Sequence, residues 1–133
     1  MTFPKKELGA KGEEIAVRYL KSIGYRILER NYRIRYGEID IIAEQGSDLV
    51  FVEVKTRSGT LFGSPFDSVT IPKQRQLSKV ALEYISKQDC HDRSSRFDVV
   101  GVELKKVNSV QLREVKIELV QNAFDLCYGN GWR

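Results

Sequence analysis

Two short apolar runs flank a polar, glycine-containing loop in the stretch GEIDIIAEQGSDLVFVEVK, which covers residues 37–55. This pattern predicts a β-hairpin with its turn at Gly46 and Ser47. The resulting register places Asp40 directly opposite Glu53, and opposed residues of an antiparallel pair share one face with Cβ atoms about 5 Å apart. Lys55 lies two residues beyond Glu53 and therefore shares that face. The stretch thus predicts two carboxylates and an ammonium group in one place.

Both faces of the predicted hairpin carry apolar residues. Val50, Val52 and Val54 alternate on one face. Phe51 shares the other face with Glu53, which indicates a sheet covered on both sides. Charged side chains on a covered sheet need a partner, and a hard divalent cation bound by carboxylate oxygens relieves the repulsion between two acids. The alternative is an ordinary surface hairpin with its charges in water.

The composition is typical of a globular domain rather than a disordered chain, since 41% of the 133 residues are hydrophobic and 30% are charged. We expect a single domain over residues 1–133. The formal charge of +4 permits an anionic partner without requiring one. The two cysteines lack a metal-binding spacing. No signal-like segment or run of transmembrane length is present, so we expect a cytoplasmic protein that does not bind membranes.

The order of elements indicates an α/β fold. Apolar periodicity and turn residues predict helices at 9–23 and 72–87 and strands at 25–35, 37–43, 49–56, 96–104 and 110–120. The strand at 25–35 is expected to be interrupted near Asn31, and a short helix is expected at 122–127. The predicted fold class is a central mixed β-sheet flanked by helices, in the order α-β-β-β-α-β-β with or without the last helix.

The two predicted helices add polar candidates. Glu13 lies on the apolar stripe of the first helix with Ala16 and Leu20, so it is expected to point inward more than Glu14 does. The alternative is an acid favoured by its place near a helix N-terminus. Gln74 opens the second helix, where it is either an ordinary first-turn residue or one that reaches toward the carboxylates or a phosphate.

A second group of candidates is basic and aromatic. Arginines contact phosphates and tyrosines stack on bases, which makes nucleic acid the expected partner of this group. The alternative is a solvated charged face. The candidate nucleic-acid-binding residues are Arg26, Arg30, Arg33, Arg35, Tyr36, Arg57, Lys73 and Arg75.

These residues resemble the Asp…Glu-x-Lys nuclease superfamily, which is restriction-endonuclease-like. More closely, the chain resembles the YraN-like family of small bacterial proteins, which are similar to archaeal Holliday-junction resolvases. The resemblance covers almost the whole chain, and although Glu-x-Lys alone is common, the ordered set of motifs is specific. The matching motifs are Gly12-Glu13, Gly24-Tyr25-Arg26-Ile27-Leu28, Asn31-Tyr32, Gly37-Glu38-Ile39-Asp40, Phe51-Val52-Glu53-Val54-Lys55-Thr56-Arg57, Lys73-Gln74, Arg96-Phe97-Asp98-Val99-Val100 and Asn122-Ala123-Phe124.

The resemblance implies a nuclease-like domain that hydrolyses phosphodiester bonds of DNA with Mg²⁺ or Mn²⁺. Asp40, Glu53 and the Val54 carbonyl would hold the metal ion, and Lys55 would be the catalytic lysine, with an electrostatic role. Glu13 would match the helix-one acid of the resolvases, and Gln74 the later helical polar residue. Ile39 replaces a proline that is frequent before the first acid.

The substrate and the biological role stay open at this point. Branched, Holliday-junction-like DNA and single-stranded DNA both agree with the resemblance, which favours DNA over RNA. One alternative is a non-catalytic DNA- or RNA-binding module on the same fold. Another is an assembly or regulatory protein whose carboxylates are structural. Resolvase relatives act as dimers, so a homodimer is also open.

Overall fold

Five strands form one mixed sheet in the order β1-β2-β3-β4-β5, with a helix on each face. The computed structural model describes residues 5–58, 64–108 and 111–126. Adjacent strands are antiparallel except β3 and β4, which are parallel. This arrangement confirms the predicted fold class and element order. The elements are α1 (Lys5–Ser22), β1 (Arg26–Ile34), β2 (Gly37–Gln45), β3 (Asp48–Ser58), the 3₁₀ turn η1 (Pro65–Ser68), α2 (Ile71–Lys87), β4 (Ser95–Lys106) and β5 (Leu112–Phe124).

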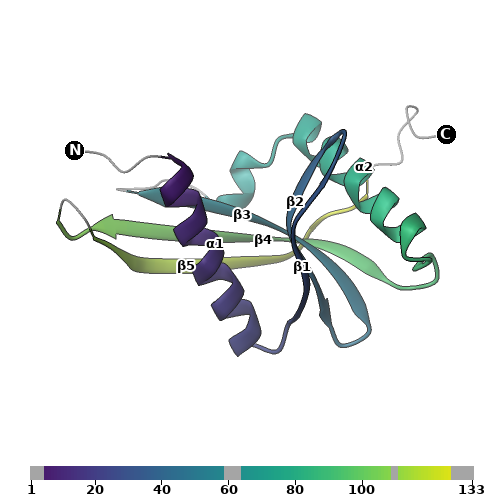
Figure 1. Cartoon of the computed structure of the whole chain (residues 1–133), viewed down its shortest axis with the longest axis horizontal. Helices are drawn as coiled ribbons and strands as arrows, with labels where there is room; N and C mark the ends of the chain where they lie inside the picture. Colours follow the sequence, from purple (N-terminus) through teal and green to yellow (C-terminus); the bar gives the residue numbers. More distant parts are fainter. Residues whose placement is uncertain (1–4, 59–63, 109–110, 127–133) are drawn as a thin grey trace.

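The helices cover opposite faces of the sheet, and α1 crosses the strands in the foreground of Figure 1. The α1 side of the core includes Ala16 and Leu20 with Val50 and Val52. The α2 side includes Phe51, packed with the α2 stripe that contains Tyr84. The sheet is therefore covered on both faces, as the apolar residues of the hairpin predict.

The hairpin register also agrees with the prediction. Ile41 pairs with Val52 and Ile42 with Phe51, which is the register set by a turn at Gly46 and Ser47. In β1, Asn31 has a φ of 52°, but the ladder to β2 continues on both sides of it. The expected interruption is thus a local twist in a continuous strand, at a residue type that tolerates the left-handed conformation.

The short helix expected at 122–127 is wrong as far as Phe124, because β5 runs through that residue. The ring of Phe124 stacks on Phe97 of β4 with centroids 4.4 Å apart. The Asn122 N–H donates to Asp98 Oδ1 at 2.9 Å. These contacts to β4 hold the segment extended. Cys127 lies outside the described residues.

Asp98 is fully buried on β4 and is the centre of a network that joins distant strands. Tyr25 Oη donates to its Oδ2 at 2.6 Å, and Arg96 Nε donates to its Oδ1 at 3.0 Å. Arg96 also pairs with Asp48 at 2.6 Å, next to the β2–β3 turn. A buried carboxylate with this many donors is compensated for its loss of water. The Arg96-Phe97-Asp98 motif therefore fastens the sheet from the start of β1 to β5.

Helix α1 approaches β3 closely at Gly12. A Cβ at this position would lie 1.8 Å from Thr56 Oγ1 and 2.7 Å from Thr56 Cβ. Threonine is branched at Cβ and cannot easily rotate away. The absence of a side chain at Gly12 therefore fixes how near α1 lies to the sheet, and with it the place of the next residue, Glu13.

We predict that Gly12→Ala destabilises the fold by about 1–3 kcal/mol, because overpacking against a branched side chain forces the backbone to shift. Gly9→Ala on the same helix is the matched control, since a Cβ there has no atom within 4 Å among the described residues. That variant should gain about 0.5–1 kcal/mol from helix propensity. Urea unfolding measures both. A gain in stability for Gly12→Ala would contradict the close packing.

Candidate active site

Asp40 and Glu53 meet just beyond the paired part of the hairpin, whose ladder runs from Ile41 opposite Val52 to the turn. Asp40 Oδ2 accepts the backbone N–H of Val54 at 2.8 Å, so a side chain continues the contact between β2 and β3. The Asp40 carboxyl also makes a hydrogen-bonding contact with Glu53. The structure therefore brings together the two carboxylates that the register predicts.

Two ammonium groups compensate Glu53, which is buried at 7% exposure. Lys55 Nζ lies 3.3 Å from Glu53 Oε2, and Lys73 Nζ lies 3.7 Å from the same oxygen. Lys55 comes from the same strand, as predicted. Lys73 comes from the first turn of α2, which approaches the sheet where β3 leaves the hairpin. The sequence indicated Lys73 as a nucleic-acid contact, and the structure adds it to the carboxylate cluster.

Burial, together with the negative charge of Glu53, raises the pKa of Asp40 to about 8. The hydrogen-bonding contact with Glu53 and the charge of Glu13 act in the same direction, whereas the Val54 N–H opposes them. Two carboxyl groups this close cannot both ionise cheaply. The pair therefore holds a proton at neutral pH unless a cation replaces it.

Glu13 and Asp40 line the same pocket between α1 and the hairpin, together with Leu8, Gly9, Val54, Lys55 and Thr56. Glu13 Oε1 accepts the side-chain amide of Asn31 at 3.0 Å. Glu14, one residue on, pairs with Arg30 at 2.7 Å on the exposed side. Glu13 thus faces the sheet, as its helical stripe predicts. Its role in the chemistry stays a prediction.

Gln74 is buried in the first turn of α2. Its Nε2 donates to the Val69 carbonyl at 3.1 Å, which ties the helix to the residue that follows η1. The contact found for Gln74 is therefore structural, and its reach toward the carboxylates stays a prediction.

The donor set suits a hard divalent cation. Within the described ranges, no group of three or more Asp, Glu, His or Cys side chains lies close enough to hold a metal ion. Asp40 and Glu53 offer carboxylate oxygens, and the Val54 carbonyl follows directly on Glu53. Mg²⁺ uses one or two carboxylates and keeps several waters. The residues present therefore fit Mg²⁺ or Mn²⁺ better than a metal that needs a complete protein cage.

Three of the four β1-side arginines are paired with carboxylates of the chain itself. Each of the three carboxylates comes from a neighbouring element, so a phosphate would have to compete with it. The pairs are Arg26 with Glu44 at 3.3 Å, Arg30 with Glu14 at 2.7 Å and Arg33 with Glu38 at 2.6 Å. Arg35 is exposed in the β1–β2 turn. Phosphate binding by this group stays a prediction, and the pairs favour the solvated-face alternative for β1.

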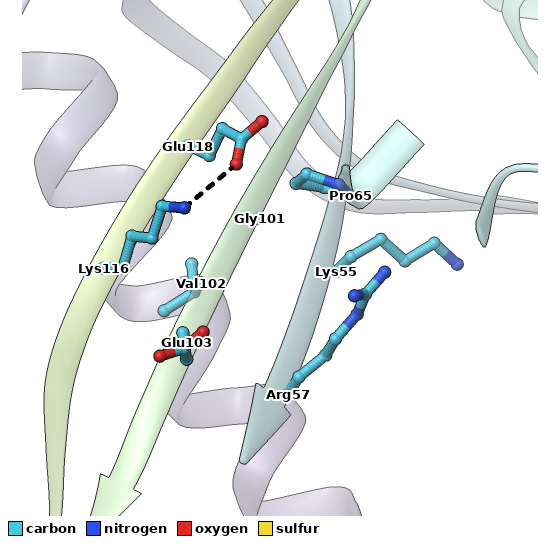
Figure 2. Close-up of a pocket in the computed structure, with 8 residues that line it drawn as sticks. All are labelled: Lys55, Arg57, Pro65, Gly101, Val102, Glu103, Lys116 and Glu118. Atoms are coloured by element: carbon cyan, nitrogen blue, oxygen red, sulfur yellow. Dashed lines mark ion pairs between the residues drawn. The ribbon is translucent and has the colours of Figure 1, made fainter. Parts of the chain in front are cut away.

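Arg57 lies beside Lys55 at a small second pocket over β3, β4 and β5 (Figure 2). The Lys55 and Arg57 side chains extend from β3 in the same direction, away from the Lys116–Glu118 pair on β5. Arg57 Nη2 donates to Ser68 Oγ at 2.8 Å, which orients the guanidinium toward η1. Gly101 lets Pro65 pack on β4, because a Cβ there would lie 2.1 Å from the proline ring.

A basic groove lies along the first turns of α2. Its lining residues are Tyr36, Pro72, Lys73, Arg75, Gln76 and Lys79. Tyr36, Lys73 and Arg75 were candidates from the sequence, whereas Gln76 and Lys79 were missed. Helical spacing could have found them, because residues three or four apart lie on the same side of a helix.

Together, the fold and the site define a mixed-sheet α/β domain with a carboxylate–lysine cluster at the open end of its central hairpin. The model of the family described as "Uncharacterised protein family UPF0102" matches residues 12–102. The chain belongs to this family, which confirms the YraN-like resemblance.

Relatives named UPF0102 protein align over nearly their whole length. The relative from Caldicellulosiruptor saccharolyticus is 48% identical over 90% of this chain and 98% of its own. The relative from Geobacter metallireducens is 48% identical over 96% of this chain and 100% of its own. The relative from Clostridium botulinum strain Loch Maree is 44% identical over 95% of this chain and 100% of its own. None of the described helices has the length and hydropathy to cross a membrane.

We predict that Asp40→Asn changes the pH dependence of stability. Since the pKa of Asp40 is raised from 3.8 to about 8, the folded protein holds a proton that the unfolded chain loses. The stability that this proton contributes is therefore complete below about pH 4 and is lost as the pH rises through about 8. Asparagine cannot ionise and keeps an oxygen for the Val54 N–H. In EDTA, the variant should melt a few degrees above the wild type at pH 9 and close to it at pH 5.

Circular dichroism melts over pH 5–9 measure this difference, with the exposed Asp92→Asn as the control for loss of a carboxylate. A melting-temperature difference for Asp40→Asn that is the same at pH 5 and pH 9 would contradict the raised pKa.

Proposed function

We propose that this chain is a metal-dependent endonuclease that hydrolyses phosphodiester bonds of DNA. The observation that supports the proposal most is the convergence of Asp40, Glu53 and Lys55 at one end of the hairpin. Two carboxylates this close, one of them buried, cost stability, so their presence favours a functional role over a structural one. Family membership agrees with the proposal but does not specify an activity.

Asp40, Glu53 and the Val54 carbonyl would hold Mg²⁺ or Mn²⁺. A bound cation of this kind supplies a water of lowered pKa and stabilises charge on a phosphoryl group. The N–H of Val54 already fixes the orientation of the Asp40 carboxyl. Lys55 and Lys73 hold the carboxylate of Glu53 through ion pairs. The two carboxylates proposed as ligands are therefore each held by a neighbouring group, which supports the proposal.

Lys55 is the residue best placed to act on the phosphate. Its ammonium lies at the carboxylate cluster and also lines the pocket beside Arg57. We assign it the stabilisation of the negative charge that develops on the phosphoryl oxygens in the transition state. Arg57 points in the same direction two residues along β3 (Figure 2) and would bind a neighbouring phosphate.

Cleavage of DNA by purified protein tests the proposal. With Mn²⁺ or Mg²⁺, the wild type should nick or cut branched or single-stranded DNA. Asp40→Asn, Glu53→Gln and Lys55→Gln should each lower the rate by about 100-fold or more, the usual cost of removing a catalytic electrostatic group. Asp92→Asn should cut like the wild type. Cleavage at the wild-type rate by all three site variants would reject the assignment.

A metal ion that binds the folded protein alone should also stabilise it, by RT ln(1 + [L]/Kd). We expect Mn²⁺ to raise the melting temperature of the wild type and of Asp92→Asn. Glu53→Gln, which removes a proposed ligand, should lose most of this rise. An equal rise in all three proteins would show that the ion binds elsewhere.

The basic groove favours a second candidate, a DNA-binding module that does not cut. Binding through phosphates weakens with salt at a log–log slope of about −0.9 for each phosphate neutralised on duplex DNA. Salt-dependent binding together with an absence of cleavage under all metal conditions would select this candidate. A binding affinity that does not change with salt concentration would exclude the DNA-binding candidate.

A further inference from the structure

Tyr36 is a large aromatic residue presented to solvent. It lies in the turn between β1 and β2, and its exposed fraction is 55%. A single exposed aromatic ring is normal on a protein surface, so the case for a binding surface rests on what lies beside the ring.

The turn that carries Tyr36 is held in place. Gln76 Nε2 donates to the Tyr36 carbonyl at 2.6 Å, which fastens the hairpin tip to α2. Gly37 permits this approach, because a Cβ there would lie 3.0 Å from the Gln76 side chain and its φ is 157°. Figure 1 shows the tip of the β1–β2 hairpin beside the first turns of α2. The exposed ring therefore sits on a fixed backbone.

Basic side chains surround the ring. Lys79 Nζ lies 5.8 Å from the centroid of the Tyr36 ring. Lys73 and Arg75 line the same groove from the first turn of α2. A stacking surface beside several positive charges is complementary to a nucleotide, which combines a flat base with a negative phosphate.

One residue of the groove also contacts the candidate active site. Lys73 lines the groove, and its Nζ also lies 3.7 Å from Glu53 Oε2. A strand whose phosphate reaches the carboxylate cluster would therefore pass Lys73 before it reaches Tyr36.

We infer that Tyr36 stacks on an unpaired base next to the phosphate that is cut, while Lys73 and Arg75 bind the backbone of that strand. The inference rests on the proposed function and names its substrate class. Inside a duplex both faces of a base are covered by its neighbours, so a protein ring gains access to a base that is unpaired or at an end. The favoured substrate is DNA with unpaired nucleotides at the cleavage point, rather than continuous duplex.

Binding measured without metal separates this inference from the cleavage test. The probes are fluorescein-labelled single-stranded DNA and a fully paired duplex of equal length, titrated in EDTA and followed by anisotropy. Tyr36→Ala should bind the single strand about tenfold more weakly, the usual loss for one base–aromatic stack. Its duplex binding should change by less than twofold. The backbone clamp from Gln76 is retained in this variant, so the fold should persist, and a melting curve checks this.

Two matched variants complete the test. Tyr36→Phe keeps the ring and should bind the single strand like the wild type. Val107→Ala, which truncates another side chain of 55% exposure in the chain segment between β4 and β5, should have no effect. A 2-aminopurine base in the single strand should be quenched by the wild type and Tyr36→Phe, and much less by Tyr36→Ala at saturation.

Equal binding of the single strand by Tyr36→Ala and the wild type, or an equal loss on single strand and duplex, would overturn the inference. Arg75→Gln should reduce the salt slope of single-strand binding by about one, whereas Lys106→Gln at the end of β4 should not. If Tyr36 passes these tests and no DNA is ever cut, the stacking site stands and the proposed cleavage fails. If DNA is cut and Tyr36→Ala has no selective effect, cleavage stands and this inference fails.

Discussion

The contact between the Asp40 and Glu53 carboxyl groups is the constraint on which the rest of the site depends. Both acids lie where β2 and β3 stop pairing, and Glu53 is almost completely removed from water. Like charges so close repel each other strongly in surroundings of low polarity. The repulsion is partly compensated by the Val54 N–H and by the ammonium groups of Lys55 on β3 and Lys73 on α2. Burial and the part of the repulsion that is not compensated raise the pKa of Asp40.

The elements that supply these compensating groups are held by unusually close packing. Gly12 lets α1 lie against Thr56, on the strand that carries Glu53 and Lys55. Gly101 lets Pro65 lie on β4, which leads the chain back toward α2 and Lys73. Positions without a side chain therefore set the distances between layers, and the charged residues are placed as a result. In such a site the close packing of the backbone determines where the charged side chains lie.

Much of this could be predicted from the sequence, because local patterns decide it. The loop at Gly46 fixes the hairpin register, and the register alone brings Asp40 to Glu53. The alternation of Val50 and Val52 with Phe51 decides that both faces are covered. The features that could not be predicted depend on contacts across long stretches of chain. The approach of Lys73 to Glu53 is set by the crossover between β3 and β4, and no local pattern encodes its end point.

One error has its origin in a local signal. The segment at 122–124 carries a residue with positive φ, Asn122, and its local signal resembles a turn into a helix. Pairing with β4 and the stack on Phe97 override that signal. The arginines of β1 form a basic run in the sequence, and in the structure Arg26, Arg30 and Arg33 each pair with an acid on another element, so their binding to phosphate stays a prediction. Further basic side chains, Lys73, Arg75 and Lys79, line the groove along α2, and the sequence marks them less clearly.

The buried network around Asp98 lies toward the β2–β3 turn, whereas Asp40 lies past the other end of the paired hairpin. The network that holds the sheet together and the candidate active site thus lie at different ends of the same strands. A variant without the carboxylates of Asp40 and Glu53 would still have Tyr25, Arg96 and Asp98 to hold its sheet together. The core therefore does not depend on the candidate site, and substitutions at that end of the strands can change what the site does while the sheet stays as it is.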